Sequence, residues 1–295
     1  MNHKTISLLS WLLILGVLNF LSTEKLPILA GVQFKKIDLN KAQLEDLMQI
    51  PKLQFKVAQS ILKERERRGC FKNFEELKAI SGVGVKTLEK LTMWAIIGGS
   101  GFENFPEFEI LEDLERETPF GLASSGAKKI RLAGEEILFI SRHGRSHELL
   151  PSEVNYQANI FLLKKLGATK ILAISSVGSL REELKPGDLV VPTQYIDRTK
   201  SIRQHTFAGN GLVSHVSLAD PVSLGLVDEL KKQTPKFDFD SHFDRTSIII
   251  EGPGFSTRAE ANYYQKIGAD IIGMTAFPEY ALAREAGMHY LPCSF

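Results

Sequence analysis

The sequence predicts an α/β protein with a central sheet flanked by helices, preceded by a small all-α module and an apolar N-terminal segment. After residue 94, short runs rich in Ile, Leu and Val alternate with helical stretches, an order typical of a sheet covered on both faces. Before residue 94, short helical stretches follow one another without a strand pattern between them. We therefore expect three parts: 1–32, 33–93 and 94–295.

The predicted strands are short, strongly apolar runs bounded by turn residues. A helix is expected from Asn155 to Leu166, because Gly167 follows as a stop signal. The expected strands are Ile137–Ser141, Lys170–Ile174, Leu189–Pro192, Ser247–Ile250 and Asp270–Ile272.

Composition is that of a globular protein, with 43% hydrophobic and 24% charged residues among 295. The net charge of +1 hides an asymmetry: residues 33–94 carry 13 Lys and Arg against 8 Asp and Glu, and residues 95–295 carry 21 against 26. Opposite signs favour two modules with different partners. Cys70 and Cys293 lack a metal-ligand or redox spacing, so both are interpreted as free thiols.

The N-terminus holds an apolar run from Ile6 to Leu21 after Lys4. Sixteen residues are short for a membrane span, which needs about 20. The run fits a membrane anchor or a signal segment, with a buried core helix as the alternative. We favour an uncleaved anchor, so membrane contact through residues 6–21 is expected.

The first module reads as four short helices. Asn40 caps the first with Gln43 as its partner, and Pro51 ends it. The remaining three are expected at Val57–Arg68, Phe74–Ile80 and Val85–Leu91.

The loop at residues 81–87 of this module has the character of a phosphate-binding turn. Gly82 and Gly84 allow backbone N–H groups to face a ligand, and Lys86 adds a positive charge at a helix N-terminus. Such a loop binds a nucleic-acid backbone without reading its bases. The alternative is a small helical bundle that binds nothing.

Residues 33–93 resemble the paired helix-hairpin-helix domain of late-competence DNA receptors. The first hairpin departs from that pattern, since residues 52–56 lack the glycines of its turn. The resemblance therefore implies DNA contact through the second hairpin. It rests on Ile37-Asp38-Leu39-Asn40-Lys41-Ala42 and Phe71-Lys72-Asn73-Phe74-Glu75-Glu76-Leu77.

In the second module, glycines, small hydroxyls and an Arg-His pair follow the predicted strands. These groups suit a small anion at the strand ends of an α/β sheet. Each motif alone is a weak indication of an anion site, because it could be a tight turn, a surface ion pair or part of the core. The prediction rests on their occurring together in this order. They are Gly98-Gly99-Ser100-Gly101, Arg142-His143-Gly144-Arg145, Ser175-Ser176-Val177-Gly178-Ser179, Glu251-Gly252-Pro253-Gly254-Phe255-Ser256 and Gly273-Met274-Thr275.

From about residue 95 to the end, the sequence resembles methylthioadenosine phosphorylases of the purine nucleoside phosphorylase superfamily. The resemblance implies a mixed central sheet and cleavage of the glycosidic bond of 5′-methylthioadenosine by inorganic phosphate, giving adenine and 5-methylthioribose 1-phosphate. It rests on Glu117-Thr118-Pro119-Phe120-Gly121, Val154-Asn155-Tyr156-Gln157-Ala158-Asn159-Ile160, Gly178-Ser179-Leu180-Arg181-Glu182-Glu183, Pro186-Gly187-Asp188, Ile196-Asp197-Arg198-Thr199 and Pro278-Glu279, besides the Arg142 motif.

The same resemblance implies residue roles, a homotrimer, phosphate as co-substrate, and neither a cofactor nor a metal. The nucleoside side would use Phe255 against the purine, Ser256 for substrate choice, Met274 under the ribose and His215 toward a neighbouring subunit. The phosphate-binding residues would be Ser100, Arg142, His143, Ser175, Ser176 and Thr275.

Two departures from the family bear on activity. Gly254 stands where the family has an arginine, and the family's base-binding aspartates belong to a segment beyond Phe295. No catalytic general acid is therefore assigned in this sequence. The expected readings are an active phosphorylase, a phosphorylase for another purine nucleoside, a small-ligand binder without turnover, or an inactive fusion whose working part is a membrane-anchored DNA-binding domain.

The two resemblances imply different compartments, because a nucleoside-salvage enzyme belongs to the cytoplasm and a DNA receptor to the membrane. The modules also meet without a linker between Leu91 and Ile96. We interpret the chain as a fusion of two neighbouring reading frames, the second cut short.

Overall fold

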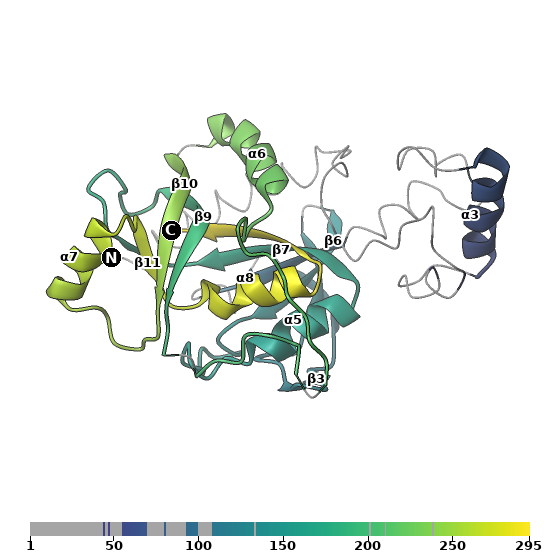
Figure 1. Ribbon diagram of the computed structural model, residues 1–295, viewed down its shortest axis with the longest axis horizontal. Coiled ribbons are helices and arrows are strands. Elements are labelled where there is room, and N and C mark those ends of the chain that lie inside the picture. The colour runs from purple at the N-terminus through teal and green to yellow at the C-terminus, as the bar shows by residue number, and fades with distance from the viewer. Residues whose placement is uncertain are drawn as a thin grey trace.

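The computed structural model describes residues 44, 47, 55–69, 80, 93–99, 108–132, 134–200, 202–209, 211–237 and 239–295 (Figure 1). The apolar segment 6–21, the loop 81–87, Cys70 and Ser100 lie outside these residues. Among the described residues, no helix has the length and apolar character needed to cross a membrane.

One large sheet organises the part after residue 93, in the order β2-β5-β6-β1-β7-β12-β9-β10-β11-β8. A separate pair joins β3 (Glu117–Thr118) to β4 (Gly121–Leu122). The strands of the large sheet are β1 (Met93–Gly98), β2 (Glu109–Asp113), β5 (Lys128–Leu132), β6 (Glu135–Ser141), β7 (Ala168–Ser175), β8 (Gly178–Ser179), β9 (Leu189–Arg198), β10 (Ser241–Ile250), β11 (Ile271–Gly273) and β12 (His289–Ser294).

Strand direction places several loops at one edge. β6, β1, β7 and β12 are mutually parallel neighbours, and β9, β10 and β11 form a second parallel set. β12 meets β9 in antiparallel fashion through Ser294 and Val190, so the sheet is mixed. The carboxyl ends of β1, β6 and β7 therefore lie at the same edge, where ligands bind in sheets of this kind.

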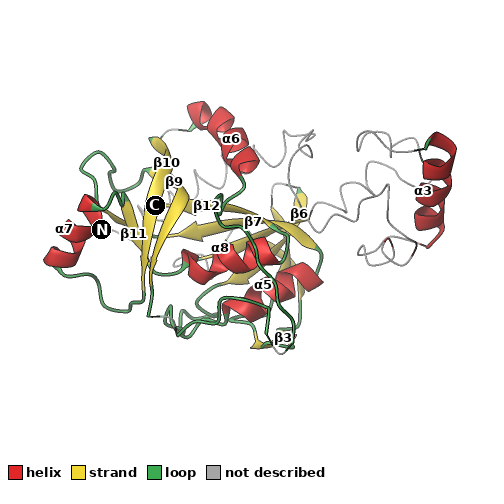
Figure 2. Cartoon of the chain, in the orientation of Figure 1, coloured by secondary structure: helices red, strands yellow, loops and turns green. Residues whose placement is uncertain are grey.

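Helices cover both faces of the sheet (Figure 2). α5 (Tyr156–Lys165) and α8 (Ala276–Glu285) lie on one side, and α6 (Leu224–Gln233) lies on the other. α7 (Arg258–Lys266) follows β10, and a 3₁₀ turn at Thr234–Lys236 extends α6. The prediction of a mixed α/β fold is confirmed.

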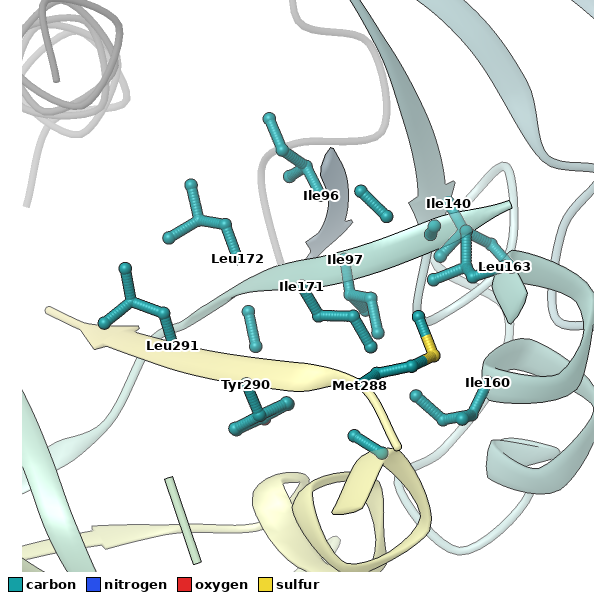
Figure 3. Close-up of a cluster of buried hydrophobic side chains, with 14 of the residues drawn as sticks. Ile96, Ile97, Ile140, Ile160, Leu163, Ile171, Leu172, Met288, Tyr290 and Leu291 are labelled. Atoms are coloured by element: carbon teal, nitrogen blue, oxygen red, sulfur yellow. The ribbon is translucent and has the colours of Figure 1, made fainter. Parts of the chain in front are cut away.

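Alternation along the strands builds the two sides of the core. Ile97, Ile171 and Tyr290 point toward the side where α5 supplies Ile160 and Leu163 (Figure 3). Their neighbours in sequence point the opposite way, because successive side chains on a strand alternate. Those neighbours are Ile96, Leu172 and Leu291.

Most predicted elements occur, but the strand ends differ. The helix expected from Asn155 is α5, with Asn155 as its cap: the side chain accepts a hydrogen bond from the Ala158 amide at 3.0 Å. β9 and β10 are much longer than expected, because each includes a stretch with polar residues: Thr193–Arg198 after the apolar run of β9, and Ser241–Thr246 before the apolar run of β10. Strand length was underestimated where the apolar run gives way to polar residues.

The described part of the first module is mainly α3 (Phe55–Arg68), which confirms the helix expected at 57–68. Val57, Ala58 and Ile61 form its buried face, and Gly69 ends it with φ of 83°. The three other expected helices, and the glycines of the 81–87 loop, fall almost wholly outside the described residues.

Candidate functional site

Arg142 lies at the edge of the sheet where the carboxyl ends of β1, β6 and β7 meet. It follows β6 directly, and its amide donates a hydrogen bond to the Gly98 carbonyl at 2.9 Å. Its guanidinium binds the Glu279 carboxylate through two hydrogen bonds, Nε to Oε2 at 2.7 Å and Nη2 to Oε1 at 2.9 Å. A third, from Nη1, goes to the Ile174 carbonyl at 2.9 Å. Both side chains are only 1% exposed.

The electrostatics of this pair keep Arg142 charged. Burial alone would lower the pKa of Arg142, but the Glu279 carboxylate raises it above its usual value. The Tyr290 hydroxyl donates a hydrogen bond to Glu279 Oε1 at 2.8 Å. A guanidinium has five N–H donors, so two of them are not engaged by Glu279 or Ile174.

Gly99 permits the close packing around this guanidinium. A Cβ at Gly99 would lie 2.8 Å from the Ile174 carbonyl oxygen and 3.0 Å from Arg142 Nη1. Any larger residue would force the end of β1 away from β7 or displace the guanidinium. The glycine motif predicted from the sequence is therefore required at this position by packing.

His143 sits beside Arg142 with a defined orientation. Its Nδ1 lies 2.9 Å from the Leu149 carbonyl, which can only accept, so Nδ1 carries the proton. Burial, with a contribution from the Arg142 charge, lowers the pKa of His143. A neutral ring with Nδ1–H leaves the Nε2 lone pair as a hydrogen-bond acceptor.

Three hydroxyl residues stand close in sequence to the groups that contact Arg142, Ile174 and Glu279. Ser175 ends β7 directly after Ile174, and its carbonyl accepts a hydrogen bond from the Phe295 amide at 3.1 Å. Thr275 precedes α8, four residues before Glu279, and its buried hydroxyl does not cap that helix. Ser176 is exposed in the turn after β7. Arg142 thus touches the elements that carry Ser175 and Thr275.

Met274 directly follows β11 and lies against the loop after β10. Gly252 adopts φ of 71°, and a Cβ there would lie 2.6 Å from Met274 Sδ. The loop after β10 therefore packs directly on the thioether. Because Met274 and Thr275 are consecutive, an apolar surface adjoins the polar groups of the anion site.

Arg203 is a positioning residue that the sequence analysis missed. It binds Glu251 through Nε at 2.8 Å and donates from Nη1 to the carbonyls of Met274 and Phe277 at 2.6 and 2.7 Å. It is 5% exposed. No local signal marked it, because the segment also contains Arg198 and Lys200 and only the fold shows which cation turns inward.

Three predicted nucleoside-binding residues lie on open loops. Phe255 is 92% exposed, Ser256 is half-buried, and His215 is exposed in the segment between β9 and α6. No contact among the described residues joins them to Arg142, so their roles stay predictions. Ser100, Gly82, Gly84 and Lys86 lie outside the described residues. Within the described ranges, no group of three or more His, Cys, Asp or Glu could hold a metal ion.

Comparison with known families identifies the fold that carries this site. Residues 94–294 match the phosphorylase superfamily model. The chain belongs to the phosphorylase superfamily. This phosphorylase domain is preceded by residues 32–95, which match the helix-hairpin-helix motif.

Curated relatives and solved structures agree with that membership. The S-methyl-5′-thioadenosine phosphorylase of Geobacter sulfurreducens is 47% identical over 195 residues, which cover 66% of this chain and 68% of the relative. That of Nitrosopumilus maritimus is 43% identical, covering 70% and 78%. A methylthioadenosine phosphorylase crystal structure from an Antarctic soil metagenomic library has a TM-score of 0.65 at 44% identity, covering 69% and 72%.

A further solved structure comes from Schistosoma mansoni. It is an N87T mutant, in its own numbering, of an adenosine/methylthioadenosine phosphorylase in complex with adenine. It matches the phosphorylase domain with a TM-score of 0.64 at 35% identity, covering 69% of this chain and 78% of the other.

Proposed function

We propose that the phosphorylase domain cleaves 5′-methylthioadenosine with inorganic phosphate, releasing adenine and 5-methylthioribose 1-phosphate. The support is the identity of 43–47% to phosphorylases named for this substrate. The observation that carries the chemistry is Arg142, a buried cation fixed by Glu279 with two N–H donors left over. Phosphate is the only co-substrate that the proposal needs.

Phosphate would be bound by complementary donors and acceptors. Arg142 donates two hydrogen bonds to phosphate oxygens, with Ser100, Ser175, Ser176 and Thr275 as further partners. His143 accepts from the P–OH of hydrogen phosphate through Nε2, because its Nδ1–H is held by Leu149. This arrangement leaves an unprotonated phosphate oxygen to act as nucleophile.

The bond changes are those of a nucleophilic displacement at the anomeric carbon. A phosphate oxygen bonds to C1′ of the ribosyl group while the bond from C1′ to the adenine nitrogen breaks. The bonding pair leaves with adenine, which takes up a proton. The oxocarbenium-like transition state is positive, so a phosphate held rigidly beneath it contributes electrostatic stabilisation. Met274 would supply the apolar surface against the ribose.

The test is adenine release from methylthioadenosine by the purified full chain, with and without phosphate. Release that requires phosphate supports the proposal. Arg142→Lys should lower kcat/KM for phosphate by roughly 10²–10³-fold, because a point charge cannot reproduce the fixed fork of donors. Arg145→Lys is the matched control, since that neighbouring side chain is 62% exposed. Phosphate-independent release, or none, would contradict the proposal.

A second substrate is the main alternative within the same chemistry. The exposed Phe255 loop leaves the base-binding side less defined than the phosphate side. Adenosine, inosine and guanosine in the same assay decide this point. A higher kcat/KM for any of them than for methylthioadenosine would reassign the substrate and keep phosphorolysis.

We also propose that the helix-hairpin-helix part binds the DNA backbone through residues 81–87. The match over residues 32–95 and the excess of positive charge in this part support it. Full-chain binding to a duplex should weaken with salt and fall several-fold in Lys86→Glu. Glu89→Lys is a control of opposite sign that should strengthen it. Binding that is independent of both salt and Lys86 would contradict the proposal.

We further propose a homotrimer in which the 211–218 segment faces a neighbouring copy. Leu212 and Val213 are 62% and 79% exposed, and Val216 and Leu218 of the same segment are exposed too, a grouping of aliphatic side chains that is typical of an interaction surface. Sedimentation should give three chains per particle. Leu212→Asp with Val213→Asp should release monomers, and a monomeric parent protein would overturn the assignment.

A further inference from the structure

The peptide group between Leu149 and Leu150 carries a hydrogen bond at each of its two polar atoms. Its carbonyl oxygen, which belongs to Leu149, accepts from His143 Nδ1 at 2.9 Å. Its N–H, which belongs to Leu150, donates to Glu153 Oε2 at 2.8 Å. The Glu153 carboxylate thus acts on the imidazole through one peptide group. Because hydrogen bonds in a chain polarise one another, the carboxylate makes the carbonyl a stronger acceptor for Nδ1–H.

A second carboxylate organises the turn that leads from His143 to this peptide. The Leu149 amide donates to the His143 carbonyl at 3.0 Å, which closes the turn. Within it, Glu148 Oε2 accepts from the Ser146 amide at 2.7 Å. Hydrogen bonds from the backbone amides of Ser146, Glu148 and Arg145 hold the pKa of Glu148 below its usual value. The chain itself therefore supplies an anion to the amides of this turn.

The backbone of the turn is strained and packs against Glu148. Gly144 has φ of 86° and His147 has φ of 57°, a region that a residue with a Cβ adopts only at a cost. A Cβ at Gly144 would lie 2.5 Å from both oxygens of the Glu148 carboxylate. The His147 ring lies 4.7 Å from the His143 ring, measured between centroids. Strain of this kind persists only where the surrounding contacts hold it.

We propose that Glu148 and Glu153 are positioning residues that hold His143 as the Nδ1–H tautomer, with the Nε2 lone pair available to hydrogen phosphate. Glu153 acts through the peptide group, and Glu148 acts through the shape of the turn. The purpose of that lone pair rests on the proposed function, whereas the tautomer follows from the hydrogen bonds alone.

Nitrogen NMR of the imidazole rings in the full chain, without substrates and at a pH where His143 is neutral, tests the tautomer directly. His143→Asn identifies the signals of this ring among the 7 histidines. The parent should show a protonated Nδ1 and an unprotonated Nε2. Glu153→Ala and Glu148→Ala should each give a mixture of both tautomers. Glu153→Gln should keep the parent tautomer, because its amide oxygen can still accept from Leu150.

Steady-state kinetics test what the tautomer does for phosphate. Each alanine variant should raise the Michaelis constant for phosphate by roughly 3–10-fold, the size of one weakened hydrogen bond. The Michaelis constant for the nucleoside and the thermal unfolding midpoint should stay near those of the parent, because Glu148 and Glu153 are exposed. Glu260→Ala is the matched control, since it removes an exposed carboxylate that accepts from the Thr257 amide at 2.7 Å in another turn. It should change neither the tautomer nor the phosphate constant.

The proposal is overturned if His143 carries its proton on Nε2 in the parent, or if both alanine variants keep the parent tautomer. It is also overturned if the tautomer changes and the Michaelis constant for phosphate does not. The NMR measurement needs no turnover, so it separates this proposal from the proposed function. A parent without phosphate-dependent turnover, in which the two variants still shift the tautomer, would contradict phosphorolysis and support the control of His143 by the two carboxylates.

Discussion

Glu279 lies 137 residues after Arg142 in the sequence and accepts two hydrogen bonds from its guanidinium in the core. Tyr290 adds a third hydrogen bond to the same carboxylate. The pair fixes the direction in which the remaining Arg142 donors point. An arginine with that restraint is already organised for an anion before the anion binds.

Glu279→Gln should destabilise the protein by about 3 kcal/mol, because it leaves the Arg142 charge buried without its counter-charge. The Michaelis constant for phosphate should rise more than that for the nucleoside, since Arg142 loses its orientation. Denaturant unfolding and steady-state kinetics measure both. Glu115→Gln, at an exposed pair with Lys165, is the control and should change neither. A phosphate Michaelis constant equal to the parent's would contradict this role of Glu279.

Gly99→Ala should cost about 1–3 kcal/mol, since its Cβ would overlap the Ile174 carbonyl and approach Arg142 Nη1. Turnover should also fall, because the Arg142 guanidinium must shift. Thermal unfolding and phosphate kinetics report the two effects. Gly254→Ala is the control, because nothing lies within 4 Å of its Cβ. Equal behaviour of the two variants would show that β1 and β7 can separate freely.

Gly252→Ala should raise the Michaelis constant for the nucleoside and leave that for phosphate nearly unchanged, because its Cβ would displace Met274. It should also lose about 1–2 kcal/mol of stability from the positive φ. Gly268→Ala has a similar φ of 92° with open space around it, so it carries the backbone strain alone. A nucleoside effect of the same size in Gly268→Ala would remove Met274 from the explanation.

His289 should make the protein less stable in acid. Its folded-state pKa of about 4 lies below the usual 6.5, so the unfolded chain binds a proton that the folded chain does not. The contribution is absent above pH 6.5, and as the pH falls to 4 up to about 3 kcal/mol of stability is lost. Unfolding free energies of the parent and His289→Gln from pH 7 to 4 measure it. If the unfolding free energies of the two proteins changed equally with pH, His289 would protonate as readily in the folded chain as in the unfolded chain.

The sequence predicted the part of the fold that depends on local pattern. The short apolar runs predicted as strands are β6, β7 and β11, and the helix predicted from Asn155 is α5, with Asn155 as its N-cap. The polar second part of β9 and the polar first part of β10 were missed, because pairing between those strands, and not their own hydrophobicity, holds them extended.

The candidate site likewise has features that the sequence predicted and features that only the structure shows. The sequence by itself determined that Arg142, His143, Ser175 and Thr275 follow strand ends, since residue type and chain order are local facts. Only the tertiary structure decided that Glu279 holds Arg142 and that Arg203 ties together the loops after β10 and β11. Those relationships arise from packing between segments far apart in the chain, which no local pattern encodes.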